Sequence, residues 1–180
     1  MVIDLAATPS GDQRLALVEL YDVALPQVYG YLAARCGSIA VAEDLTSETF
    51  LAAADAVRRD TAPVLSIAWL VGIARHKLVD HWRRQERERR SLAAVAGEEE
   101  PLDDWNVRLD AIVARGVLAT LAPQHRAALT LRYVDGLPVR RVAELMGRTE
   151  GATEVLLVRA KAAFRRAYDG HPRHARGEQR

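Results

Sequence analysis

The sequence has only one cysteine, Cys36. A single thiol excludes an internal disulfide and favours a reducing compartment, where its default role is that of a small buried hydrophobe. No apolar run approaches the ~20 residues that a membrane-spanning helix needs, and the N-terminus lacks a basic stretch followed by an apolar one. These absences predict a cytoplasmic protein without membrane insertion.

Motifs of catalysis and of metal binding are absent as well. The sequence contains no GxSxG, no phosphate-binding glycine run, no HExxH and no paired cysteines. His76 and His81 lie five residues apart on one predicted helix, so they do not share a face as a metal pair would. The sequence predicts a protein that is not an enzyme, with no catalytic residue, no metal ligand and no cofactor.

Glycine and proline are few, at 11 and 7 of 180 residues, and they fall mostly between periodic stretches. The hydrophobic fraction of 49% suffices for compact cores, and together these features predict an all-α chain. We expect two small helical domains joined by a flexible acidic linker and followed by a disordered basic tail. The domains cover 11–90 and 106–169, the linker 91–105 and the tail 170–180.

Helical periodicity places most of the expected elements. Pro26 should kink or break the first helix, and Ser38 should cap the second. The stretch between the second and third helices contains a proline and has no period, which predicts a loop. The expected helices are 13–35, 39–57, 66–88, 106–121 and 123–134, with a loop at 58–66 and a turn at 135–136.

Two short helices that meet at a glycine-containing turn are expected within residues 137–161. Pro138 suits the first turn of a helix, and Gly147, which is free to take positive φ, suits its end. The inward residues of the pair are Val139, Val142, Ala143, Met146, Thr153, Leu157, Ala160 and Phe164. This pattern predicts a DNA-binding helix-turn-helix, although similar helix pairs also occur in proteins that never touch DNA.

The net charge of +1 hides a separation of charge along the chain. Residues 1–57 carry eight acidic and two basic side chains, a net −6, whereas residues 75–90 carry seven basic and three acidic ones, a net +4. Residues 140–166 also come to +4. This asymmetry predicts two kinds of partner, one basic and one anionic.

The basic end of the third helix has two interpretations. Its arginines return to adjoining faces near Trp82, and they are Arg83, Arg84, Arg87 and Arg90. With Trp82 exposed, the interleaved aromatic and basic groups would stack bases and hold a nucleic-acid backbone. The alternative is a solvated amphipathic face.

Five strings resemble a known family. Residues 42–51 and 68–81 resemble region 2 of extracytoplasmic-function (ECF) sigma factors, which are group 4 of the sigma-70 family. Residues 121–126, 131–137 and 142–147 resemble region 4 of the same family. The strings follow in the right order across a linker of the usual kind.

The resemblance implies a promoter-specific subunit of RNA polymerase. In this family the first domain docks on the clamp helices of the β′ subunit, and the β flap is a further polymerase surface that the resemblance implies. The two domains read the −10 and −35 elements of promoter DNA, while catalysis and its magnesium belong to the polymerase. The resemblance also implies an anti-sigma factor that covers both domains.

Three sets of residues follow from the resemblance. The core-binding set is Asp44, Leu45, Glu48 and Phe50. The −10 set is Arg58, Arg59, Arg75, Lys77, Asp80, Arg83 and Arg84, and its loop at 58–66 resembles the one that captures an unstacked base. The −35 set is Arg148, Thr149, Glu154, Val155, Val158 and Arg159.

Some of these residues could equally serve a purely structural role. Leu45, Phe50, Trp69 and Leu70 also suit a hydrophobic core, and Asp80 suits a local pair with a neighbouring arginine. For the whole chain, one alternative is a stand-alone helix-turn-helix regulator that does not depend on polymerase. Another is a helical interaction protein whose basic faces are only solvated.

One departure from the family pattern falls in the last helix. Thr153 takes a position where an inward apolar residue is usual, and Glu154 replaces a cation at a groove-facing position. A carboxylate near phosphate is unfavourable, but Glu can accept a hydrogen bond from cytosine N4, and Val155 suits contact with a thymine methyl. We expect an atypical −35 sequence or a weaker reliance on that element.

Overall fold

A computed structural model describes residues 10–92 and 111–170, and all regular secondary structure in these ranges is helical. The elements in chain order are α1 (Ser10–Cys36), α2 (Ile39–Arg58), α3 (Ile67–Leu92), α4 (Ala111–Thr120), α5 (Pro123–Leu129), the π-helix η1 (Thr130–Val134), α6 (Val139–Met146) and α7 (Glu150–Asp169). The prediction of an all-α fold is confirmed. Most of the predicted linker and tail lies outside the described residues.

Packing divides the chain into two compact units, Met1–Asp80 and His81–Arg180. The division falls inside α3, so the last turns of this helix, residues 81–92, pack with the second unit. The expected domain bounds follow the family pattern and stay a prediction. This division places the basic end of α3 in the same unit as the helix-turn-helix.

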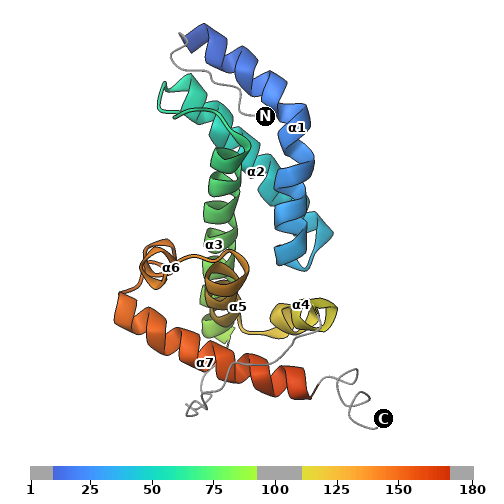
Figure 1. Cartoon of the computed structure of the whole chain (residues 1–180), viewed down its shortest axis with the longest axis vertical. Coiled ribbons are helices and arrows are strands. Elements are labelled where there is room, and N and C mark those ends of the chain that lie inside the picture. Colours follow the sequence, from blue (N-terminus) through green and yellow to red (C-terminus); the bar gives the residue numbers. More distant parts are fainter. Residues whose placement is uncertain (1–9, 93–110, 171–180) are drawn as a thin grey trace. The chain divides into compact units, whose positions relative to one another are not determined.

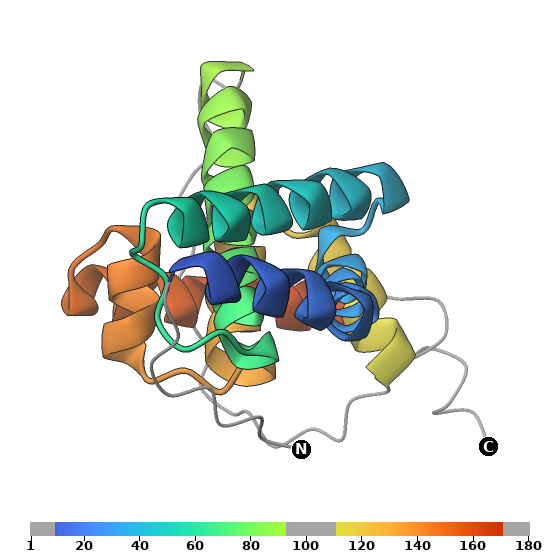
Figure 2. The ribbon, with the colours of Figure 1, turned by 90° about the horizontal axis from the view of Figure 1, so that it is seen from above.

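In the first unit, α1 and α2 lie side by side in both views (Figure 1, Figure 2). Ala24, Val28 and Leu32 recur every fourth residue on α1 and are fully buried, as a helical stripe should be. An edge-to-face contact between Tyr21 and Phe50, with ring centroids 4.8 Å apart, joins the two helices. The first core is therefore built from small and aliphatic side chains with one aromatic pair at its edge.

The ends of these helices follow the expected local chemistry. Ser38 caps α2, because its Oγ accepts a hydrogen bond from the Val41 N–H at 3.5 Å. Pro26 does not break α1, which runs through it as one helix. Residues 59–66 connect α2 to α3 without regular structure, which confirms the predicted loop.

In the second unit, α7 contacts α4, α5 and α6 and so connects the other helices (Figure 1). Its buried stripe confirms the predicted inner face, namely Thr153, Leu157, Ala160 and Phe164. Opposite it, Val142, Ala143 and Met146 of α6 are buried, whereas Val139 stays partly exposed. This arrangement confirms the predicted pair of helices at 137–161.

The predicted helix over 123–134 is divided in the structure. It begins as α5 and continues as the π-helix η1, where the Asp135 N–H donates to the Thr130 carbonyl at 2.9 Å, five residues back. A π-turn inserts one extra residue per turn, and an apolar period does not reveal it. The predicted turn at 135–136 follows, with Gly136 at φ 69°.

Helix ends also define the helix-turn-helix. Gly147 ends α6 in the left-handed region at φ 60°, which confirms its predicted role. Thr149 caps α7, since its hydroxyl accepts from the Ala152 N–H at 3.2 Å. Thr153 points inward with no exposed surface, and its hydroxyl donates to the Thr149 carbonyl at 2.9 Å, so the buried oxygen is satisfied.

Candidate polymerase-binding and nucleic-acid interfaces

The core-binding set lies on α2, but its members differ in exposure. Asp44 is exposed, and Glu48 is partly exposed. Leu45 is only 5% exposed, which agrees with its alternative interpretation as a core residue, because α2 turns this face toward α1. Phe50 is half-buried against Tyr21. What remains as a surface is the acidic face of α2.

An ion pair links this acidic face of α2 to α3. The Lys77 ammonium lies 3.2 Å from a carboxylate oxygen of Glu48, and both side chains are partly exposed. The pair connects a member of the core-binding set with a member of the −10 set. A substitution at Glu48 would therefore disturb both predicted surfaces.

The arginines of the predicted −10 loop are both exposed, and both bind one carboxylate. Arg58 and Arg59 lie 2.5 and 2.9 Å from the two oxygens of Asp55. The hydrogen bond from Arg58, more than any other interaction, lowers the pKa of Asp55. Asp60, next in the chain, takes a left-handed conformation with φ 55° and turns the chain into the loop.

The −10 set does not lie within one unit. Arg75, Lys77 and Asp80 belong to the first unit, whereas Arg83 and Arg84 belong to the second. Arg84 is exposed, as a DNA contact requires. Arg83 instead donates a hydrogen bond to the Leu145 carbonyl at the end of α6, so the helix-turn-helix holds it.

The interpretation of this segment that requires an exposed Trp82 is wrong. Its side chain is 1% exposed and lies in the second unit, where the Arg126 guanidinium sits 5.7 Å from the ring centroid. Arg126 also donates to Gln85 on α3 at 2.7 Å and to the Ala119 carbonyl at 3.3 Å. Sequence reasoning treated α3 as an isolated amphipathic helix, but packing covers the face that carries Trp82.

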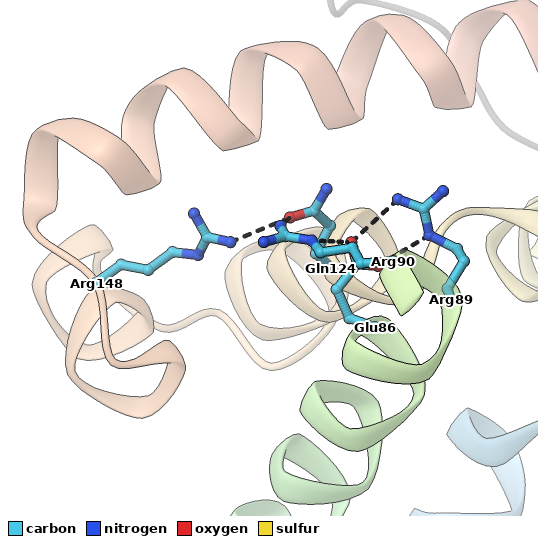
Figure 3. Close-up of polar contacts among 5 residues, drawn as sticks. All are labelled: Glu86, Arg89, Arg90, Gln124 and Arg148. Atoms are coloured by element: carbon cyan, nitrogen blue, oxygen red, sulfur yellow. Dashed lines mark hydrogen bonds and ion pairs between the residues drawn. The ribbon is translucent and has the colours of Figure 1, made fainter. Parts of the chain in front are cut away.

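A buried carboxylate organises the arginines one turn further along α3 (Figure 3). Glu86 is 6% exposed and accepts hydrogen bonds from Arg89 at 3.0 and 3.2 Å and from Arg90 at 2.9 Å. Burial by itself would raise the pKa of Glu86, but the bonds from the two arginines outweigh it and the pKa is lowered. His125 lies in the same unit, and its pKa is lowered, chiefly by burial.

Gln124 connects this cluster to the −35 set (Figure 3). Its side-chain oxygen accepts one hydrogen bond from Arg90 at 3.0 Å and another from Arg148 at 3.1 Å. Sequence reasoning did not assign Gln124 to a site, although it lies in the string 121–126 that resembles region 4. Only the fold brings it between two arginines that are far apart in the sequence.

The rest of the −35 set lies at the beginning of α7. Thr149 is exposed and caps the helix, while Glu154 and Arg159 are exposed and Val158 is partly so. Val155 is 51% exposed. These side chains occupy adjoining positions on the side of α7 that its buried stripe leaves open, so their residue types suit a face that meets DNA bases.

Comparison with known proteins identifies the family. Residues 20–88 match the family described as Sigma-70 region 2, and residues 114–164 match Sigma-70, region 4. The ECF RNA polymerase sigma factor SigL of Mycobacterium tuberculosis is 32% identical over 152 residues, which cover 81% of this chain and 85% of SigL. The chain belongs to the ECF RNA polymerase sigma factors.

Another relative of this sigma factor is the ECF RNA polymerase sigma factor BldN of Streptomyces coelicolor, 34% identical over 165 residues. That match covers 88% of this chain but 62% of BldN. A solved structure of RpoE from Bartonella quintana, in complex with the anti-sigma factor NepR, has a similar fold. Its TM-score is 0.53 at 21% identity, over 86% of this chain and 98% of RpoE. These matches favour a sigma factor that directs transcription over a stand-alone helix-turn-helix regulator.

No helix in residues 10–92 and 111–170 is long and apolar enough to cross a membrane. Among the same residues, no group of three or more His, Cys, Asp or Glu side chains could hold a metal ion.

Proposed function

We propose that this sigma factor binds core RNA polymerase through the acidic face of α2 and reads promoters at two places. The loop at 59–66 and the adjoining basic part of α3 serve the −10 element. The exposed face of α7 serves the −35 element, and the β′ clamp helices and β flap are the polymerase surfaces involved. The observation that carries the proposal is the presence of regions 2 and 4, in order, with an exposed acidic face in one and an exposed helix-turn-helix in the other.

At the −35 element, we propose that α7 recognises bases with few charged side chains. Glu154 suits acceptance of a hydrogen bond from cytosine N4, and the exposed Val155 suits contact with a thymine methyl. Arg159, one turn beyond Val155, supplies a cation for the backbone. This combination predicts a −35 sequence that differs from those read by a cation at position 154.

Two further proposals come from the family. Since sigma factors act with polymerase on chromosomal DNA, we place this chain in the cytoplasm as a non-enzymatic subunit without a cofactor. The RpoE structure contains NepR, and that partner belongs to RpoE. For this chain, an anti-sigma factor is proposed from the family resemblance.

Run-off transcription with purified core polymerase tests the proposed function. The expected result is initiation from a defined subset of genomic fragments that core enzyme alone does not use. The absence of promoter-dependent initiation on every genomic template would sink the proposal.

The acidic face of α2 can be tested by charge reversal. Asp44→Arg should weaken binding to core polymerase at least about tenfold, because like charges placed across an interface cost more than a lost contact. Glu19→Arg on α1 makes the same change of charge at an exposed position outside the proposed interface. Equal binding by both variants would mean that only the total charge of the first unit matters.

The reading of bases by α7 can be tested through Glu154. Promoter selection from a randomised −35 region should shift for Glu154→Lys, because the amine donates where the carboxylate accepts. Asp169→Lys, at the other end of α7, is the matched control and should select the same sequences as the parent chain. An unchanged preference for Glu154→Lys would remove this residue from the base-reading face.

A further inference from the structure

Helix α6 carries a charged surface that lies outside the core-binding, −10 and −35 sets. Its exposed charged residues are Arg140, Arg141 and Glu144. The buried residues of this helix are all apolar, namely Val142, Ala143, Leu145 and Met146. Because Glu144 follows the two arginines by three and four positions, the three charged side chains share the side of α6 that is open to solvent.

Glu144 binds both arginines at once. Its carboxylate oxygens accept a hydrogen bond from Nη1 of Arg141 at 2.5 Å and another from Nε of Arg140 at 3.3 Å. The bond from Arg141 is the largest of the interactions that lower the pKa of Glu144, so the carboxylate is ionised at neutral pH. With two cations and one anion, this side of α6 has a net charge of +1.

The two arginines keep most of their hydrogen-bonding capacity for another anion. Their side chains are 77% and 55% exposed, for Arg140 and Arg141 in turn. A guanidinium has five N–H groups, and the bond to Glu144 uses one of them in each arginine. An exposed ion pair of this kind contributes little to stability, so the pairs with Glu144 are easily rearranged.

The place of α6 in the helix-turn-helix indicates which anion it meets. In such motifs the second helix enters the major groove, while the first helix crosses the sugar–phosphate backbone. Here α6 is the first helix and packs against α7, the second (Figure 1). A guanidinium fork fits a phosphate group, so two exposed arginines on the first helix suit the DNA backbone.

We propose that Arg140 and Arg141 bind the phosphate backbone beside the −35 element, and that Glu144 limits the positive charge that they present to it. The proposal rests on the proposed function, because these phosphates belong to the promoter that α7 reads. It assigns to α6 a contribution to the strength of binding, whereas the exposed face of α7 contributes the choice of sequence.

The first unit repeats this arrangement at its own candidate DNA surface. Arg58 and Arg59 of the −10 set both contact one carboxylate, that of Asp55, at 2.5 and 2.9 Å. Their side chains are also well exposed, and the three charges again leave a net +1. Two exposed arginines on one carboxylate therefore occur in both units, each time beside residues that the family resemblance assigns to promoter DNA.

Removing either arginine should weaken promoter binding and reduce its dependence on salt. The measurement uses the full chain with core polymerase, on a promoter fragment found by run-off transcription. One phosphate contact contributes ~0.9 to the slope of log affinity against log salt concentration. The ratio of parent affinity to that of Arg140→Ala or Arg141→Ala should therefore fall roughly threefold when the salt concentration rises from about 50 to 200 mM.

Arg115→Ala is the matched control for the lost charge. Arg115 is exposed on α4, outside the helix-turn-helix, and its replacement should leave the affinity and the salt slope unchanged. If Arg115→Ala weakens binding as much as Arg141→Ala does, only the total charge of the chain matters and the proposed site is wrong.

The role of Glu144 is tested by an uncharged side chain of the same shape. Glu144→Gln should raise the affinity and steepen the salt slope by up to about one contact, because the arginines then present both charges. Asp169→Asn removes an exposed negative charge at the far end of α7 and should change neither quantity. A Glu144→Gln variant that melts at a lower temperature but binds the promoter like the parent would mean that Glu144 only stabilises α6.

Sequence selection separates a backbone contact from a base contact. Since phosphate contacts carry no sequence information, Arg141→Ala should select the same sequences as the parent from a randomised −35 region. A shifted preference would overturn the backbone assignment. Circular dichroism melting checks that each variant is folded. If the parent chain itself initiates on no template, the proposed function fails; if the parent initiates and the arginine variants bind like it, only this inference fails.

Discussion

Replacing Trp82 with alanine should destabilise the second unit severely. A buried tryptophan removes roughly 150–250 Å² from water, and at ~25 cal/mol per Å² this corresponds to about 4–6 kcal/mol. An alanine side chain still buries part of this area, and comparable truncations in protein cores cost about 3–5 kcal/mol of stability. Because Trp82 is only 1% exposed, we expect a loss of stability at the upper end of this range. The contact with the Arg126 guanidinium, 5.7 Å from the ring centroid, adds to the loss.

Thermal unfolding followed by circular dichroism measures this effect. With about 4–8 °C per kcal/mol for a domain of this size, Trp82→Ala should lower the melting temperature of the second unit by about 12 °C or more. Hydrogen exchange should show lost protection in α4–α7 and retained protection in α1 and α2, because Trp82 packs in the second unit.

Trp82→Phe is the matched control. It keeps an aromatic ring in the core and removes an indole N–H that has no hydrogen-bond partner among the described residues. We expect a clearly smaller loss of stability than for alanine. If Trp82→Ala instead melts like the parent chain and loses only DNA affinity, the ring is an exposed stacking platform and the packing argument fails.

Three further predictions concern the helix-turn-helix and its surroundings. Burial lowers the pKa of His125 below 6.5, so the unfolded chain binds the proton more readily than the folded protein. The free energy of unfolding should therefore be highest above pH 6.5 and should decrease as the pH falls below this value. His125→Gln should weaken this pH dependence, as measured by urea unfolding at several pH values. Gly147→Ala should cost about 1–2 kcal/mol, because φ is 60° there, and an alanine variant as stable as the parent would contradict the strain argument. Thr149→Ala should cost about 1 kcal/mol by removing the α7 cap, whereas Thr149→Ser should keep it, so equal losses for the two would show that the hydroxyl is not what matters.

Much of the fold followed from local sequence patterns. The caps at Ser38 and Gly147 depend on the conformational needs of single residues, so they were predictable without knowing any partner. The inner face of α7 followed from helical periodicity for the same reason. The π-helix after α5 did not, because a turn with one extra residue leaves no mark in an apolar period.

The candidate surfaces were less predictable than the helices. Asp44 and Glu154 are exposed as expected, since a charged side chain is seldom buried without a partner. For Leu45 and Trp82 one of two interpretations requires a surface position, and both side chains are buried. An apolar residue on an amphipathic helix fits a core and an interface equally well, and only the neighbouring helices distinguish the two.

The sequence by itself determined the helical class, the helix-turn-helix, the separation of charge and the motifs of an ECF sigma factor. Each of these is a property of residue type and spacing, and the matches to regions 2 and 4 agree with them. The tertiary structure decided which arginines stay exposed and which are held. Gln124 accepts hydrogen bonds from Arg90 and Arg148 only because the fold brings α3, α5 and the turn before α7 together, and hydrogen bonds between such distant positions leave no periodic trace in a chain.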